Sequence, residues 1–175
     1  DGAAVAEKLR LDHDGQLGIG VATPASLLHV AGTVQVGVDD TGHDVIFYGD
    51  AAGAFAMWDT SADSFIVRGA SADAAGSSGR IVLQTAQTDV RNDDILGRID
   101  WNAPNEHATD GNDIAGSIWV EAEDTFSATV NESAMVFATG VSGAATEEMR
   151  LLGNGRLGIG VANPASLLHV AGTVQ

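Results

Sequence analysis

The amino-acid sequence predicts an all-β chain, and three observations lead to that fold class. Apolar runs of about five residues alternate with turn clusters at intervals of roughly 8 to 12 residues, which is the pattern of many short strands. Helical periodicity is not sustained along the chain. Glycine is abundant, with 22 residues, and only 5% of residues are aromatic, so the composition suits thin layers better than one thick core.

One segment occurs twice, and this repeat organises the chain. Residues 10–35 return as residues 150–175, in a constant register of 140 residues. Of the 26 aligned positions 21 are identical, and the five pairs that differ are Asp12/Leu152, His13/Gly153, Asp14/Asn154, Gln16/Arg156 and Thr23/Asn163. A globular enzyme gains nothing from the same segment at both ends, whereas an array of tandem units requires it. The spacing predicts a 140-residue repeat, of which the sequence covers one period and the start of the next.

The repeated segment predicts a hairpin followed by a further strand. Asp14-Gly15 in the first copy and Asn154-Gly155 in the second both favour a tight hairpin turn. In the strand after the turn, Gly18 and Gly20 share one face, and glycine within a strand often marks the close approach of another backbone. We expect that backbone to belong to a second chain.

The rest of the chain divides into two blocks of expected strands. In the first block they lie at residues 33–38, 43–49, 54–58 and 64–68, and in the second at 80–85, 94–101, 115–123 and 134–139. A run of Gly, Ala and Ser at residues 69–79 predicts a flexible connection between the blocks. The expected segments are residues 1–35 (first copy of the repeat start), 36–79 (β subdomain with linker), 80–148 (compact β domain) and 149–175 (second copy).

The charge of the chain is strongly acidic, which excludes some partners. Twenty-four acidic residues against eight basic ones leave a net charge of −16. Such a surface repels phosphates and anionic lipids, so we expect no nucleic acid partner and no membrane insertion. No apolar run approaches the roughly 18 residues that span a bilayer. The sequence has no cysteine, which excludes disulfides and thiolate metal sites.

Two groups of carboxylates are candidates for chemistry. Asp39, Asp40 and Asp44 lie within six residues, and oxygen-rich loops of this kind hold Ca²⁺, although the glycine and bidentate glutamate of an EF-hand are missing. Aspartates are also common in plain turns, so a structural turn is the other interpretation. Glu121 and Glu123, two apart on an expected strand, could be a glycosidase pair or a solvated face. The sequence contains no nucleotide-binding loop or nucleophile elbow, and we expect no enzyme and no cofactor other than the candidate Ca²⁺.

The second copy of the repeat resembles a signature of viral fibres. It reads Met149-Arg150-Leu151, then Gly153-Asn154-Gly155-Arg156-Leu157-Gly158-Ile159-Gly160, Pro164 and Leu168-His169-Val170. This run is similar to a shaft signature of bacteriophage tail fibres and related virion fibres, and residues 33–49 resemble a fibre segment of phages of marine bacteria. The resemblance implies a homotrimeric fibre on the virion that mediates attachment to a glycan or protein of the host surface. The chaperone domain that often follows this signature is missing from the sequence, so a tail or a capsid position stays open.

The strand pattern and the resemblance together predict where chains meet. Short strands rich in Gly and Ala bury too little surface alone, and three chains around one axis bury one another's apolar faces and pair their edges. We therefore expect an elongated, intertwined trimeric β fibre with a small β domain inserted in each 140-residue repeat. The expected trimer contacts are Gly18, Ile19, Gly20, Leu28, His29, Gly158, Ile159, Gly160, Leu168 and His169.

A long polar loop at residues 102–113 is the candidate receptor-facing surface, because loops of this length are often functional. The candidate contact residues are Asn105, Glu106, His107 and Asp110. Two other functions stay open at this point. One is a glycan-cleaving tailspike, and the other is a bacterial surface filament or adhesin built from the same repeat.

Overall fold

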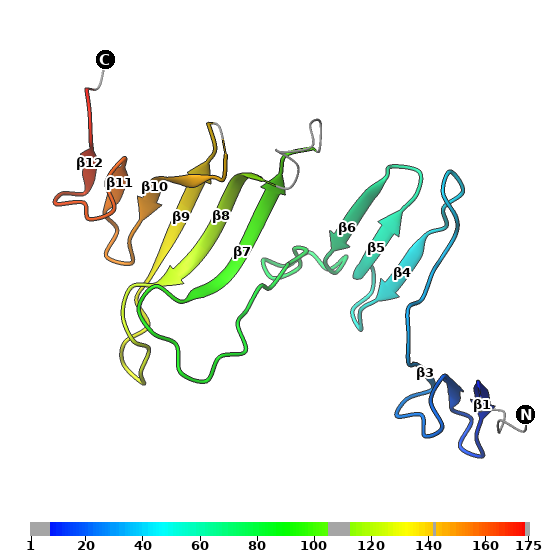
Figure 1. Ribbon diagram of the computed structural model, residues 1–175. Coiled ribbons are helices and arrows are strands. Elements are labelled where there is room, and N and C mark those ends of the chain that lie inside the picture. Colours follow the sequence, from blue (N-terminus) through cyan, green and yellow to red (C-terminus); the bar gives the residue numbers. More distant parts are fainter. Residues whose placement is uncertain (1–7, 105–112, 142, 174–175) are drawn as a thin grey trace, which may run out of the picture. The chain divides into compact units, whose positions relative to one another are not determined.

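The computed structural model describes residues 8–104, 113–141 and 143–173 (Figure 1). Within these residues the chain forms twelve strands in three sheets and no helix, so the prediction of an all-β fold is confirmed. The chain divides into two compact units, Asp1–Ile81 and Val82–Gln175. Each unit has its own sheets, and the two copies of the repeat fall in different units.

The first sheet of unit 1 consists of the first copy of the repeat. β1 (Leu9–Leu11) pairs antiparallel with β2 (Leu17–Ile19), and β3 (Leu28–Val30) pairs parallel with β2. The turn between β1 and β2 requires a glycine, because Gly15 has a φ of 77°. The predicted hairpin and the strand after it are both present.

The second sheet of unit 1 is a meander of three antiparallel strands. They are β4 (Val45–Tyr48), β5 (Phe55–Asp59) and β6 (Ser64–Arg68). The β4–β5 connection turns at Gly53 with a φ of 82° and the β5–β6 connection at Asp63 with a φ of 47°. Glycine and aspartate tolerate this left-handed conformation better than most residues, so the turn residues fix the hairpin lengths.

Unit 2 contains a six-stranded sheet in which the second copy of the repeat forms one half (Figure 1). The strands are β7 (Ile95–Asn102), β8 (Ile114–Ala122), β9 (Ser133–Thr139), β10 (Thr146–Leu151), β11 (Leu157–Ile159) and β12 (Leu168–Val170). They follow one another in sequence order across the sheet, and every neighbouring pair is antiparallel except β11 with β12. The segment expected as a separate compact domain is therefore continuous in one sheet with the repeated segment that follows it.

The buried core of the described chain is small, as the composition suggests. Its buried apolar side chains are Ala122, Ala134, Val136 and Ala138, and Val136 is the largest that is fully buried. All four belong to β8 and β9, the middle of the unit 2 sheet. Such a core excludes little water, so most apolar side chains of the chain stay in contact with solvent.

Two expected strands are wrong. Residues 33–38 and 80–85 form no strand, and in this part of the described chain only an isolated bridge joins Val38 to Thr41. The alternation of apolar residues specifies one face of an extended segment, but a strand also needs a neighbouring edge. Val34 and Ile81 are 66% and 65% exposed, so the described residues give these two side chains little apolar cover.

Candidate functional site

One face of the unit 2 sheet is apolar along all six strands. Residues directly opposite each other in neighbouring strands share a face, and the registers place twelve apolar side chains together. They are Ile99, Trp101, Ile118, Val120, Met135, Phe137, Met149, Leu151, Leu157, Ile159, Leu168 and Val170. We call this set the apolar face of unit 2.

The apolar face of unit 2 is only partly covered by the chain. Leu168 is 58% exposed, Trp101 52% and Ile99 48%, and none of the twelve side chains is buried. Large contiguous apolar patches are uncommon on monomeric proteins and mark surfaces that another molecule covers. This face is therefore the main candidate functional surface of the chain, and its apolar side chains suit association with another molecule.

The opposite face of the same sheet carries a charged network instead. The Arg150 guanidinium lies 2.7 Å from Glu121 Oε1 and forms two hydrogen bonds with the Glu147 carboxylate, of 2.7 and 2.8 Å. The indole nitrogen of Trp119 donates to Glu121 Oε2 at 2.6 Å. Glu121 is only 8% exposed, so its charge depends on these partners. The network ties β8 to β10 and attaches the second copy of the repeat to the rest of unit 2.

The electrostatics of this face follow from the same contacts. The hydrogen bond to Glu147, and then the charges of Glu121 and Glu147, raise the pKa of Arg150 against the effect of its burial. Nearby, a hydrogen bond from the Ser117 hydroxyl, followed by one from Arg98, lowers the pKa of Asp100. Both shifts favour the charged form, so Arg150 stays protonated and Asp100 stays ionised near neutral pH. Arg150 is therefore a fixed positive charge in this network rather than a proton donor.

The first copy of the repeat has a matching apolar face in its own sheet. The registers place six apolar residues on one side of β1–β3, namely Leu9, Leu11, Leu17, Ile19, Leu28 and Val30. Leu11 is 69% exposed and Leu9 62%. Ile19, Leu28, Ile159 and Leu168, four of the expected trimer contacts, therefore lie on exposed apolar faces, and their contact with another chain stays a prediction.

The glycines of the repeat are explained by close contacts and backbone conformation within their own chain. A Cβ atom on Gly18 would lie 2.5 Å from the Val21 carbonyl oxygen and 2.9 Å from Cγ of Pro24, so the approaching backbone is that of the same chain. Gly158 makes the equivalent close approach to Val161. Gly20 and Gly160 have φ values of 72° and 67°, which side chains rarely adopt. Their role as contacts between chains stays a prediction.

The repeated histidines also have partners within the chain. Nδ1 of His29 accepts a hydrogen bond from the Ala25 amide at 3.3 Å, and Nδ1 of His169 accepts one from Ala165 at the same distance. Each ring thus closes the loop that precedes its strand. Since both copies show the same bond, this local structure is intrinsic to the segment.

The small sheet of unit 1 has apolar side chains on both faces. The registers place Val45, Phe47, Ala56, Trp58, Phe65 and Val67 on one face, and Ile46, Tyr48, Phe55, Met57, Ile66 and Arg68 on the other. Tyr48 is 78% exposed and Phe47 67%. A single layer of three strands is rarely stable without cover, so both faces of this sheet are further candidate surfaces for association.

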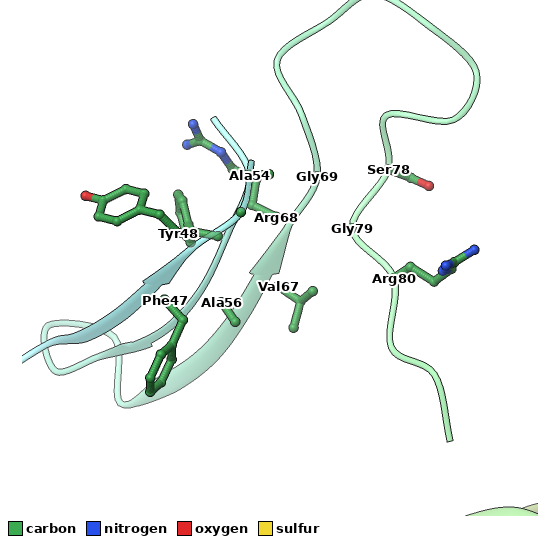
Figure 2. Close-up of a pocket in the computed structure, with 12 residues that line it drawn as sticks. Phe47, Tyr48, Ala54, Ala56, Val67, Arg68, Gly69, Ser78, Gly79 and Arg80 are labelled. Carbon is green, nitrogen blue, oxygen red and sulfur yellow. The ribbon is translucent and has the colours of Figure 1, made fainter. Parts of the chain in front are cut away.

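A hollow of about 280 Å³ lies at one end of this small sheet, between β4–β6 and the returning segment at residues 78–80 (Figure 2). The Arg68 guanidinium carbon lies 4.6 Å from the Phe55 ring centroid, and its Nε donates to the Gly53 carbonyl at 2.9 Å. Figure 2 shows Phe47 and Tyr48 pointing to different sides of the strand. The described lining includes no carboxylate and no histidine, so the hollow offers aromatic and guanidinium contacts rather than acid–base chemistry.

Two of the candidate calcium residues, Asp39 and Asp40, lie in a turn, and the third, Asp44, binds the connection between β5 and β6. Asp44 accepts hydrogen bonds from the Thr60 amide at 3.0 Å and from its hydroxyl at 2.8 Å, which hold the pKa of Asp44 below its ordinary value. Asp39 and Asp40 line an adjacent hollow together with Trp58. Among the residues that the structure describes, no group of three or more His, Asp or Glu side chains is placed to hold a metal ion.

The other candidate residues separate in the structure. Glu121 pairs with Arg150, whereas Glu123 lies just beyond β8 and accepts a hydrogen bond from the Gly153 amide at 2.6 Å. Both carboxylates therefore hold the second copy of the repeat in place. The candidate receptor residues Asn105, Glu106, His107 and Asp110 lie outside the described residues.

The ion-pair network around Arg150 was not predicted from the sequence. The sequence contains one signal for it, since Glu121 and Trp119 alternate with the apolar side chains of a nine-residue strand and so face the opposite side. Which arginine meets them depends on the order of the strands in the sheet, and residues 121 and 150 are too far apart in sequence for spacing to reveal it.

No model of a known protein family matches the chain, and no curated protein is significantly similar to it. Among the residues that the structure describes, there is no helix long and apolar enough to cross a membrane. The geometry of the exposed faces is therefore the main evidence on function.

Proposed function

We propose that this chain is a structural segment of a virion fibre, assembled as a homotrimer from repeated units, and that the fibre takes part in attachment to the host cell surface. The 140-residue repeat and the resemblance of its second copy to fibre shafts support this proposal. Receptor contact, with a surface glycan or protein, is assigned to the loop at residues 102–113.

The observation that carries the proposal is the exposed apolar face of unit 2 and its recurrence in β1–β3. The face extends across all six strands, and the six apolar positions of β1–β3 match the last six of unit 2 in the repeat register. A face that recurs with the repeat gives copies of the chain a contact in every period. Burying it also removes the apolar surface that a soluble monomer would leave in water.

The distribution of charge supports the same conclusion. In β7–β9 the other residues on the same side of the sheet are also uncharged, namely Gly97, Gly116, Ala122, Ser133 and Thr139, although the chain as a whole has a net charge of −16. Interface centres are depleted of charged residues, and an acidic remainder keeps an assembled rod soluble. Glycan cleavage is not proposed, because Glu121 is held by Arg150 and Glu123 by Gly153.

Sedimentation equilibrium of the purified chain tests the proposal. We expect a species of three times 17.8 kDa at micromolar concentration. Ile159→Lys should abolish this species, because it places a charge on the apolar face, whereas Thr129→Lys in an exposed polar loop should not change it. A folded monomer at micromolar concentration, shown by far-ultraviolet circular dichroism and a cooperative melt, would contradict the trimer.

A further inference from the structure

The two copies of the repeat differ at one edge. β10 has a neighbour on both sides, because it pairs with β11 and with β9. Its counterpart β1 pairs with β2, and the strands of the described chain place no second neighbour beside it. An open strand edge is a template for pairing with another strand. The second copy shows which strand fits that edge.

The backbone groups of β1 point outward at the same positions that β10 uses. Gly20 donates its amide to the Lys8 carbonyl at 2.9 Å, and Asp12 donates to Gln16 at 3.0 Å. Because successive residues of a strand alternate their hydrogen-bonding direction, the groups of Leu9 and Leu11 face away from β2. Their counterparts Met149 and Leu151 face β9, opposite Phe137 and Met135.

The side chains match as well as the backbone. Arg10 is the counterpart of Arg150, whose guanidinium binds the Glu121 carboxylate of the neighbouring strand pair. Leu9 and Leu11 are the counterparts of Met149 and Leu151, which continue the apolar face across β9. A strand pair with the sequence of β8–β9 would therefore find on β1 an arginine on one face and two apolar side chains on the other.

In unit 2 one edge of β9 is covered by β8 and the other by β10. We propose that the outer edge of β1 is the docking site for the β9 strand of a second copy of residues 82–144 in the neighbouring repeat, where β1 takes the place that β10 has in unit 2. In this joint Leu9 lies opposite Phe137 of that copy, Leu11 lies opposite its Met135, and Arg10 binds its Glu121. The inference rests on the proposed fibre built from repeated units, and it specifies how one unit joins the next along the fibre. The joint reproduces the β9–β10 pairing that the chain itself contains.

An extended chain tests the joint directly. Residues 82–144 are placed before residue 5, so that Leu9 follows the added β9 at the same distance along the chain as Met149 follows β9. Amide hydrogen exchange is then measured at Leu9 and Leu11 in the extended and the 175-residue chains. We expect exchange at both amides to slow by about 100-fold in the extended chain, because they become ladder hydrogen bonds in a continuous sheet. Glu121→Gln in the added copy should reduce that protection.

A cysteine pair provides a second readout, since the chain contains no cysteine of its own. In the extended chain, Leu11→Cys paired with Met135→Cys of the added copy should form a disulfide under mild oxidation within one chain. Leu11→Cys paired with Ser133→Cys, two residues further along the added strand, is the matched control and should cross-link far less.

Exchange at Leu9 and Leu11 that equals the rate in the 175-residue chain, together with no preference for the Met135→Cys pair, overturns the inference. Sedimentation of the same extended chain reports separately on the trimer. A trimer without the cross-link rejects only the joint, and a monomer with protected amides and the cross-link rejects only the trimer.

Discussion

The two copies of the repeat have nearly the same sequence and the same local fold, but they differ in how they are attached. In both, a hairpin is followed by a parallel third strand in the same register, and the same histidine closes the loop before that strand. Only the second copy is joined to a larger sheet, through β9 and the ion pairs of Arg150. The repeated segment therefore determines its own local fold, and the strands next to it determine whether it becomes part of a larger sheet.

The copies also show which local contacts can vary. In the first copy, Oδ1 of Asp12 accepts the amides of Asp14 and Gln16, at 3.0 and 2.9 Å. In the second copy a leucine replaces this aspartate, and Oδ1 of Asn154 accepts the Arg156 amide at 3.1 Å instead. Two different side chains thus stabilise one turn, because the turn only needs an acceptor near its free amides. Gly15 and Gly155, by contrast, occupy the same turn position in both copies, with φ values of 77° and 82°.

The largest expected difference between the copies is at their shared arginine. Arg150→Ala should lower the free energy of unfolding of the 175-residue chain by about 3 kcal/mol, because it leaves the buried Glu121 charge without its partner. Arg10→Ala, at an exposed position, should change it by no more than about 0.5 kcal/mol. Urea denaturation measures both values. Equal losses in the two variants would mean that the network does not distinguish the copies.

The second prediction concerns the glycines after the hairpin. Gly160→Val and Gly20→Val should each destabilise the repeat by about 2 kcal/mol, because both positions have a positive φ that a β-branched residue adopts only with strain. Thermal melting followed by circular dichroism measures the loss. Leu167→Val, at an exposed position of the same copy, is the matched control and should have little effect. An unchanged melting temperature in either glycine variant would show that the local geometry is not as strict as the structure indicates.

The smallest expected effect is at the turn that the copies close differently. Asp12→Ala should cost about 1 kcal/mol, because two amides lose their acceptor, and Asn154→Ala about 0.5 kcal/mol, because one does. The exchange rates of the Gln16 and Arg156 amides, compared with the parent chain, report on each turn separately. If Asn154→Ala had the greater effect, the count of accepted hydrogen bonds would not explain the turns.

Much of the local structure could be predicted from the pattern of residues. The Asp-Gly and Asn-Gly dipeptides indicated the hairpins, and the alternation of apolar residues indicated the strands of both β-rich blocks. The same alternation at residues 33–38 and 80–85 predicted strands that the structure does not contain. A segment becomes a strand only where another strand offers a free edge beside it. The residue pattern of a single segment does not show which strands become its neighbours.

The sequence by itself determined the all-β class, the 140-residue register of the repeat and the local shape of each copy. These properties depend on residues close together in the chain, through turn chemistry and the two-residue alternation of a strand. Only the tertiary structure decided that β9 covers the edge of β10, that Arg150 meets Glu121, and that one largely apolar sheet face is only partly covered by the chain. Those facts depend on which distant strands become neighbours, and that is set by the packing of the whole unit.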